Sequence, residues 1–408
     1  MADILDMFGD GNPFRQAAQP IRKFARIGLM ERPAPGMMRV KGTNWAILFA
    51  ILVGILACHI VAPGTPRPTP LSSSEFRVLE LDTRGMLTDM HGDSAVGMDE
   101  DGELWLVNVR TADMRQLTND GHYKRGPVLS DAHIAWIEEG EDIQLPGDDG
   151  RSKNTADVFV MDLLTGEQRR ITDMPANRSH LRISGSWLVW QDNRNELRER
   201  RERYDIYAYD LSHDREIPIA VIAGNQKQPS IHGDVVVWSD NRDSPQIGTR
   251  DEGCHNLPDR HCDIYSYNLA TGEEKLLAQT GTNNGSPAIH GDLVVWQQYL
   301  ESCSSLIVLL DMGTGEQRDV GTGGRSNTRP LVSADHVVWA EKEPCDVGGF
   351  PRLLANRSAA GAFVYRLDTG QVRRLSNYVE AQTLLHDDMA VITEGCHMPS
   401  RRYALFLD

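Results

Sequence analysis

Five of the six cysteines lie in the second half of the chain, and two of them that are close in sequence each have a histidine beside them. Cys254-His255 and His261-Cys262 offer thiolate and imidazole groups, which are ligands that Zn²⁺ prefers. Their spacing matches no known zinc motif, so the sequence predicts no metal and no other cofactor. Clustered cysteines in an exported domain favour disulfide bonds instead. The disulfide candidates are Cys254, Cys262, Cys303, Cys345 and Cys396, of which Cys254 and Cys262 can close a local loop and one must stay free or pair with another chain.

Two short charged motifs follow a tryptophan in identical register, Asp192-Asn193-Arg194 and Asp240-Asn241-Arg242. Opposite charges on connecting loops can contact a ligand, so we take Asp192, Arg194, Asp240 and Arg242 as candidate binding residues. The alternative is a turn in which Asp accepts backbone N–H groups and Arg pairs with a neighbouring repeat. The charged run 194–203 offers a docking surface, or else a solvated loop.

The sequence indicates no catalytic residue. It contains no Gly-x-Ser-x-Gly motif, and its Ser, His and Asp residues show no spacing that predicts a triad. His232 and His290 occupy short turns, where we expect exposed side chains rather than ligands. Catalysis by residues that converge only in the folded protein stays open.

The elements that position these residues follow from one constant interval. In five places, the polar residue that ends a short apolar segment lies 28 residues before a tryptophan. The intervals from each tryptophan to the next such polar residue are instead 26, 20, 30 and 15. A unit of fixed length joined by variable connections is typical of repeat proteins. The pairs are Asn108 and Trp136, Asp162 and Trp190, Asp210 and Trp238, Asn268 and Trp296, and Asp311 and Trp339.

Each repeat consists of short strands. Residues 205–210 and 263–268 alternate β-branched or aromatic side chains with others, and Thr-Gly-Glu turns follow such segments. Four short antiparallel strands per repeat predict an all-β propeller, and the tryptophans within Val-Val-Trp strands predict core packing. We expect seven blades, with six as the alternative. Residues 76–81 supply the missing strand of the last blade and close the ring, which removes an exposed sheet edge.

The segments Trp238-Ser-Asp-Asn-Arg242, 205–211 and Thr271-Gly-Glu273 resemble the repeats of TolB-like β-propeller proteins. The resemblance covers roughly residues 86 to 407. It implies the propeller fold and leaves the function open, because function resides in sites rather than folds.

The N-terminal residues predict export of the propeller. Residues 45–62 are apolar apart from Cys58 and His59, and the 43 residues at the N-terminus carry seven basic and four acidic groups. The positive-inside rule therefore predicts a cytoplasmic segment at 1–43, one transmembrane signal anchor at 44–63, a proline-rich linker at 64–74 and an extracytoplasmic propeller at 75–408. The alternatives are a lipoprotein signal, with Cys58 as the lipidated residue, and a cleaved signal peptide.

A net charge of −16 disfavours nucleic acid as a partner. We therefore expect a single-pass protein of the cell membrane, whose propeller faces the periplasm or the cell exterior. Its loop-rich face is expected to bind a protein or a glycan as a scaffold. The alternatives are an enzyme at the channel mouth, of the lactonase, glycosidase or lyase type, and a carbohydrate-binding module of the envelope.

Overall fold

The computed structural model describes residues 77–81, 85–140, 155–195, 203–243, 261–300, 304–321, 326–342, 361–376, 382–394 and 401–407. The chain divides into two compact units, Met1–Pro63 and Gly64–Asp408, and every described residue belongs to the second. The predicted segments 1–43, 44–63 and 64–74 lie outside the described residues. The described part of the chain contains no helix that is long and apolar enough to span a membrane.

The described residues form 28 strands in four concentric sets. The innermost strands are β2 (Met86–His91), β6 (Lys124–Leu129), β10 (Arg178–Ser184), β14 (Gln226–His232), β18 (Asn284–His290), β22 (Ser326–Val332) and β26 (Gln382–His386). The second strands are β3 (Ser94–Met98), β7 (His133–Glu139), β11 (Trp187–Asp192), β15 (Val235–Asp240), β19 (Leu293–Tyr299), β23 (His336–Lys342) and β27 (Met389–Glu394). The third strands are β4 (Leu104–Asn108), β8 (Ala156–Asp162), β12 (Asp205–Asp210), β16 (Asp263–Asn268), β20 (Ser305–Asp311), β24 (Gly361–Arg366) and β28 (Arg401–Phe406). The outermost strands are β5 (Met114–Gln116), β9 (Gln168–Arg170), β13 (Arg215–Ala220), β17 (Glu274–Ala278), β21 (Gln317–Asp319), β25 (Val372–Ser376) and β1 (Arg77–Glu80).

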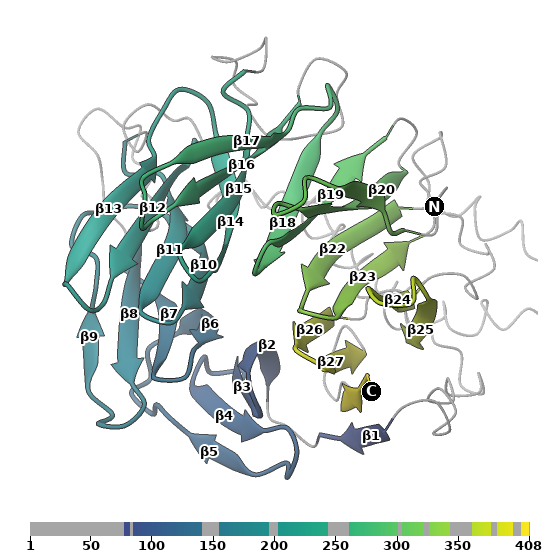
Figure 1. Ribbon diagram of the computed structural model, residues 1–408. Helices are drawn as coiled ribbons and strands as arrows, with labels where there is room; N and C mark the ends of the chain where they lie inside the picture. The colour runs from purple at the N-terminus through teal and green to yellow at the C-terminus, as the bar shows by residue number, and fades with distance from the viewer. Residues whose placement is uncertain are drawn as a thin grey trace, which may run out of the picture. The chain divides into compact units, whose positions relative to one another are not determined.

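These strands build a seven-bladed β-propeller (Figure 1). Each blade pairs its four strands antiparallel, and each innermost strand contacts the innermost strands of the two adjacent blades, including β26 with β2. One parallel bridge, between Ser305 and Ser326, joins blades five and six into a single hydrogen-bonded sheet. The prediction of seven blades is confirmed, and the six-bladed alternative is wrong.

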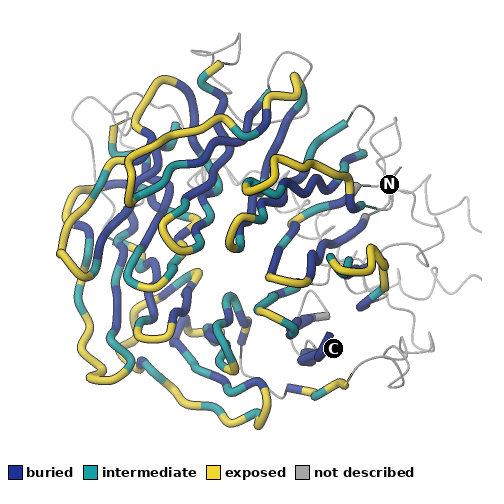
Figure 2. Tube along the Cα trace, viewed as in Figure 1, coloured by how far each residue is buried: buried dark blue, intermediate teal, exposed yellow. Residues whose placement is uncertain are grey.

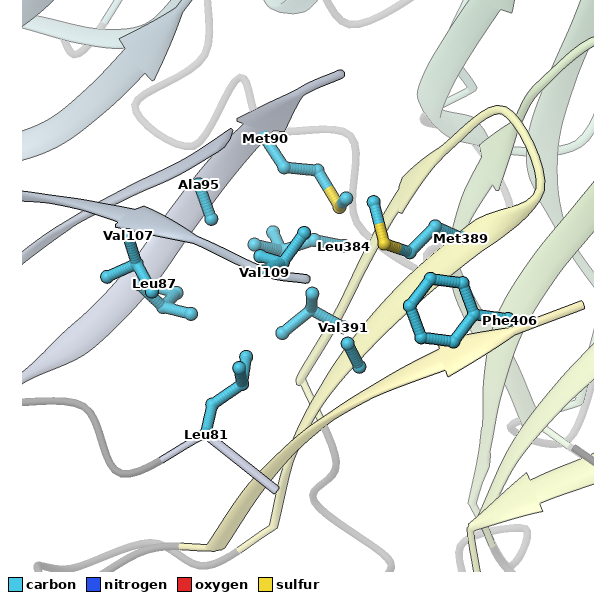
Figure 3. Close-up of a cluster of buried hydrophobic side chains, with 11 residues drawn as sticks. Leu81, Leu87, Met90, Ala95, Val107, Val109, Leu384, Met389, Val391 and Phe406 are labelled. Carbon is cyan, nitrogen blue, oxygen red and sulfur yellow. The ribbon is translucent and has the colours of Figure 1, made fainter. Parts of the chain in front are cut away.

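The N-terminal strand closes the ring. β1 pairs antiparallel with β28 and becomes the outermost strand of blade seven. Behind it, Leu81 joins a buried cluster that also contains Leu87 and Val107 of blade one and Val391 and Phe406 of blade seven (Figure 3). The predicted closing strand is therefore present, and it completes a blade whose third strand would otherwise be a free edge.

Tryptophans of the second strands form the core between blades. Five of them are fully buried: Trp136, Trp190, Trp238, Trp296 and Trp339. Trp190 of blade three packs with Val158 and Val160 of blade two, and Trp238 packs with Ile206 and Ala208 of blade three. Each tryptophan fills the space against the preceding blade. The constant interval runs from the end of the third strand of one blade through its fourth strand and the first strand of the next blade to the tryptophan in the second strand.

The topology gives the propeller two unlike faces. The connections between second and third strands lie on the same face as the links between blades, and we name it the loop-rich face. The hairpin turns between first and second strands form the opposite, narrow face, where exposed turn residues alternate with buried strands (Figure 2). His232 and His290 lie on the narrow face and are half-buried, which corrects the expectation that they are exposed.

Candidate functional site: the inner wall

Six of the seven innermost strands share a backbone irregularity. Their pairing with the second strand shifts register within the strand in blades one to six. In blades two to six the shifted residue has a positive φ of 51° to 57°, at Gly126, His180, Gln228, Ser286 and Arg329. A β-bulge of this kind re-aims side chains at strand edges and near binding sites. We name the surface around these bulges, on the innermost strands, the inner wall.

The charge of the innermost strands is opposite to that of the whole protein. The chain has 42 Lys and Arg against 58 Asp and Glu. The innermost strands have six basic residues and one acidic residue, which are Lys124, Arg125, Arg178, Arg182, Lys227 and Arg329 against Asp89. Lys124 and Arg178 are fully buried and already form ion pairs, Lys124 with Glu103 and Asp120 and Arg178 with Asp192. Four cations and one carboxylate therefore remain for the inner wall.

Asp89 of blade one and Arg182 of blade three interact electrostatically. Asp89 Oδ2 accepts a hydrogen bond of 2.8 Å from the backbone N–H of Leu129 on β6. Burial raises the pKa of Asp89, while the Leu129 N–H and the Arg182 guanidinium oppose that rise. Arg182 donates to the carbonyl oxygen of Leu181 at 2.8 Å and is exposed to solvent. Its charge is only partly balanced by one carboxyl group of weakened acidity.

His180 lies between two cations of the inner wall. Its side chain is exposed at the surface, but the surrounding protein still desolvates the imidazole ring, which disfavours its charged form. This desolvation, together with the charges of Arg182 and Lys227, lowers the pKa of His180 to about 4. The imidazole is therefore neutral at pH 7.

Two further cations border this group. Lys227 Nζ lies 5.5 Å from the ring centroid of Tyr204, which is a cation–π contact. Arg125 Nε is buried and has no hydrogen-bond partner among the described residues. A buried donor without a partner is uncommon in folded proteins and invites an acceptor from outside the chain.

The four residues that the sequence singled out lie inside their blades. Asp192 is fully buried and accepts hydrogen bonds from Arg178 Nε at 2.9 Å, Arg194 Nη2 at 2.6 Å and Trp190 Nε1 at 3.2 Å. Arg194 also pairs with Glu216 at 2.6 Å and stacks on the Tyr207 ring at 3.9 Å.

Blade four repeats this arrangement with one substitution. Asp240 accepts hydrogen bonds from Trp238 Nε1 at 2.9 Å, Arg242 Nη2 at 2.6 Å and Gln226 Nε2 at 3.2 Å, so the buried partner is a neutral amide rather than arginine. Arg242 pairs with Glu274 at 2.7 Å. Both arginines pair within their own blade, which corrects the expectation of a pair with a neighbouring repeat. These contacts give the motifs a structural role, and their role in binding stays a prediction.

A cavity of about 430 Å³ lies beside Arg194, between blades two and three. It is also lined by Arg170, Asp173, Met174 and Glu216. Its two arginines are already paired, Arg170 with Asp157 at 3.0 Å and Arg194 with Glu216 at 2.6 Å. The charges of this cavity are therefore balanced, unlike those of the inner wall.

The cysteine predictions fall mostly outside the described residues. Cys58, Cys254, Cys303, Cys345 and Cys396 all do so, and Cys262 is fully buried immediately before β16 on the loop-rich face. Disulfide pairing stays a prediction. Within the described ranges, no group of three or more His, Cys, Asp or Glu side chains is placed to hold a metal ion.

The sequence did not single out the inner wall, because each of its cations stands alone in its own strand. Arg125, Arg182 and Lys227 are separated by about 50 residues along the chain and meet only through the ring. A usable signal was present, since the innermost strands can be aligned by their turns and their charges counted.

Comparison with known proteins supports the fold and leaves the activity open. No family model and no curated protein matches the chain. A solved structure of oligogalacturonate lyase from Vibrio parahaemolyticus is similar with a TM-score of 0.55 and 13% identity, covering 83% of this chain and 96% of that one. A putative TolB from Agrobacterium tumefaciens gives a TM-score of 0.43 and 16% identity over 67% of this chain and 87% of that one. The tricorn protease gives a TM-score of 0.44 and 12% identity over 76% of this chain and 29% of that one.

The resemblance to TolB-like propellers is confirmed. At these identities the likeness shows the fold alone.

Proposed function

We propose that the protein is a binding propeller, anchored to the membrane through residues 44–63, whose inner wall holds an anionic group of a partner outside the cytoplasm. The observation that carries the proposal is the excess of four cations over one carboxylate on the inner wall of an acidic protein. Cations that are gathered on a concave, poorly hydrated surface attract anions more strongly than the same charges dispersed in water.

Exposed apolar side chains favour a protein as the partner. Five of the large exposed apolar residues lie at the loop-rich face, at the start of β2 or on the links between successive blades: Met86, Tyr123, Met174, Val221 and Ile222. They belong to blades one to four, which also supply Arg125, Arg182 and Lys227. A protein segment with acidic and apolar residues matches both features, since protein interfaces combine apolar anchors with charge complementarity.

Titration of the full-length chain with a fluorescent hexaglutamate peptide tests this proposal. The double variant Arg182→Gln, Lys227→Gln should weaken binding about tenfold or more, because each lost charge-assisted contact is worth about 1 kcal/mol or more. The matched control is Arg318→Gln, Lys275→Gln, which removes the same charge from exposed outer strands. Equal weakening in both double variants, or no binding by the wild-type chain, would overturn the proposal.

A second test addresses the anchor and the orientation. Protease added to intact cells should digest residues 75–408 and spare residues 1–43, because the anchor would leave the propeller outside the cytoplasm. Protection of the propeller would contradict export, whatever the peptide titration shows.

An enzyme at the same surface is the second candidate, and His180 is the observation that favours it. A neutral imidazole beside Arg182 and Lys227 can accept a proton from a bound anionic substrate, although its low pKa makes it a weak base. Under this alternative, His180→Gln should abolish turnover of an acidic saccharide or lactone without weakening its binding. Unchanged turnover in that variant would exclude this role.

A further inference from the structure

The residue immediately before the two-residue turn between the first and second strands is histidine or serine in all seven blades. These residues form the strand-end ring: His91, Ser130, Ser184, His232, His290, Ser333 and His386. Each faces the first residue of the second strand across a two-residue turn. The ring therefore lies on the narrow face, where the turns join the first and second strands.

Members of the ring contact the turn of the next blade along the chain. Ser184 Oγ accepts a hydrogen bond of 2.9 Å from the backbone N–H of Gly233. His232 Nδ1 accepts one of 3.0 Å from the backbone N–H of Gly291. Blades three and four thus use the same geometry with two different acceptors, a hydroxyl that does not titrate and an imidazole that does.

The hydrogen bond from Gly291 fixes the protonation of His232. A backbone N–H can only donate, so Nδ1 must accept, and the ring proton must reside on Nε2. An imidazolium carries protons on both nitrogens, and its Nδ1–H would meet the N–H of Gly291 head-on. Protonation of His232 therefore requires that this contact break.

The surroundings of His232 act in the same direction. The His232 and His290 rings lie 4.2 Å apart between centroids, so two positive charges there would repel. Burial and His290 lower the pKa of His232, with a smaller effect of His91, while Asp387 opposes the fall. Burial and His386 lower the pKa of His290, and Asp387 and Asp335 oppose it.

We propose that the narrow face carries an acid-sensitive latch between blades four and five, in which neutral His232 holds the turn of blade five through the N–H of Gly291. A lowered pKa in the latched state means that the latch is fully formed above the ordinary histidine pKa of 6.5 and weakens as pH falls below it. Acid then releases the turn at residues 290–293, while the turn of blade four stays held by Ser184.

Amide hydrogen exchange of the full-length chain tests the latch, with Gly233 as an internal control. After correction for the intrinsic exchange rate, protection of the Gly291 amide should fall about tenfold between pH 7.5 and pH 5, as proton linkage of one histidine allows. Protection of Gly233 should change less than twofold. Parallel changes at the two amides, or a constant value at Gly291, would overturn the proposal.

Two exchanges of residues between the blades sharpen the test. His232→Ser gives blade four the acceptor of blade three, and it should remove the pH dependence at Gly291. Ser184→His should create a pH dependence at Gly233. A pH dependence that persists at Gly291 in His232→Ser would assign the effect to another group and refute the latch.

Discussion

The two ends of the innermost strands are built differently. Within their first five residues, counted from the loop-rich face, they carry the positive-φ bulges and the cations Arg125, Arg182, Lys227 and Arg329. The residues that precede the turns of the narrow face are histidine or serine in every blade and contact the adjacent turn at several junctions. One strand thus provides an end open to partners and an end that joins the blades.

Connection length explains why the ends diverge. The turns between first and second strands have two residues in every blade, so equivalent side chains of successive turns lie at the same level along the propeller axis. The connections of the loop-rich face vary in length, as the intervals of 26, 20, 30 and 15 residues show. Variation there leaves the blades intact, which is the usual reason why binding surfaces lie on loops.

The largest effect is expected for a buried charge at the loop-rich end. Asp192→Asn removes one of the two carboxylates that pair with the fully buried Arg178 and leaves Asp157 at 3.2 Å, so we expect a cost of about 3 kcal/mol, the lower end of the range for loss of a partner of a buried pair. Asp240→Asn faces the neutral Gln226 instead, so we expect a cost of about 1–2 kcal/mol from weakened hydrogen bonds. Urea unfolding of both variants measures the difference. Equal costs would show that Arg178 is solvated when its partner is lost.

A smaller effect is expected at the bulges. Gly126→Ala places a side chain at φ 55°, which should cost about 1 kcal/mol of the free energy of unfolding. His180→Gly at φ 54° relieves the same backbone strain, which stabilises the folded protein. Glycine also increases the entropy of the unfolded chain, which destabilises the folded protein, and the two effects partly cancel. We therefore expect little loss of stability in His180→Gly. A loss as large as that of Gly126→Ala would mean that the His180 side chain is needed for packing.

The smallest effect is expected on the narrow face. Ser184→Ala removes one exposed hydrogen bond to Gly233, with a cost of about 0.5–1 kcal/mol. The loss should appear as faster amide exchange at Gly233 alone. Faster exchange in all seven turns would show that the strand-end ring acts as one cooperative unit.

The sequence was sufficient for the fold because the repeat is local. Fixed strand and turn lengths place each tryptophan, and the unpaired segment at 76–81 identifies the closing strand. The sites depend on closure of the ring, which brings together residues far apart in the chain. Ser184 and Gly233 are 49 residues apart, and His232 and Gly291 are 59 apart. No local pattern at either residue reveals such a contact, so the inner wall and the latch required the structure.

The difference between the two ends is tested most directly by locating a bound anion. Crystals of the full-length chain soaked with selenate at pH 7.5 should show an anomalous peak in contact with Arg182 or Lys227 on the inner wall, and none at His232 and His290 of the strand-end ring, because burial lowers the pKa of both histidines. Selenate bound only on the outer strands or at the strand-end ring would contradict the assignment of the inner wall as the anion-binding surface.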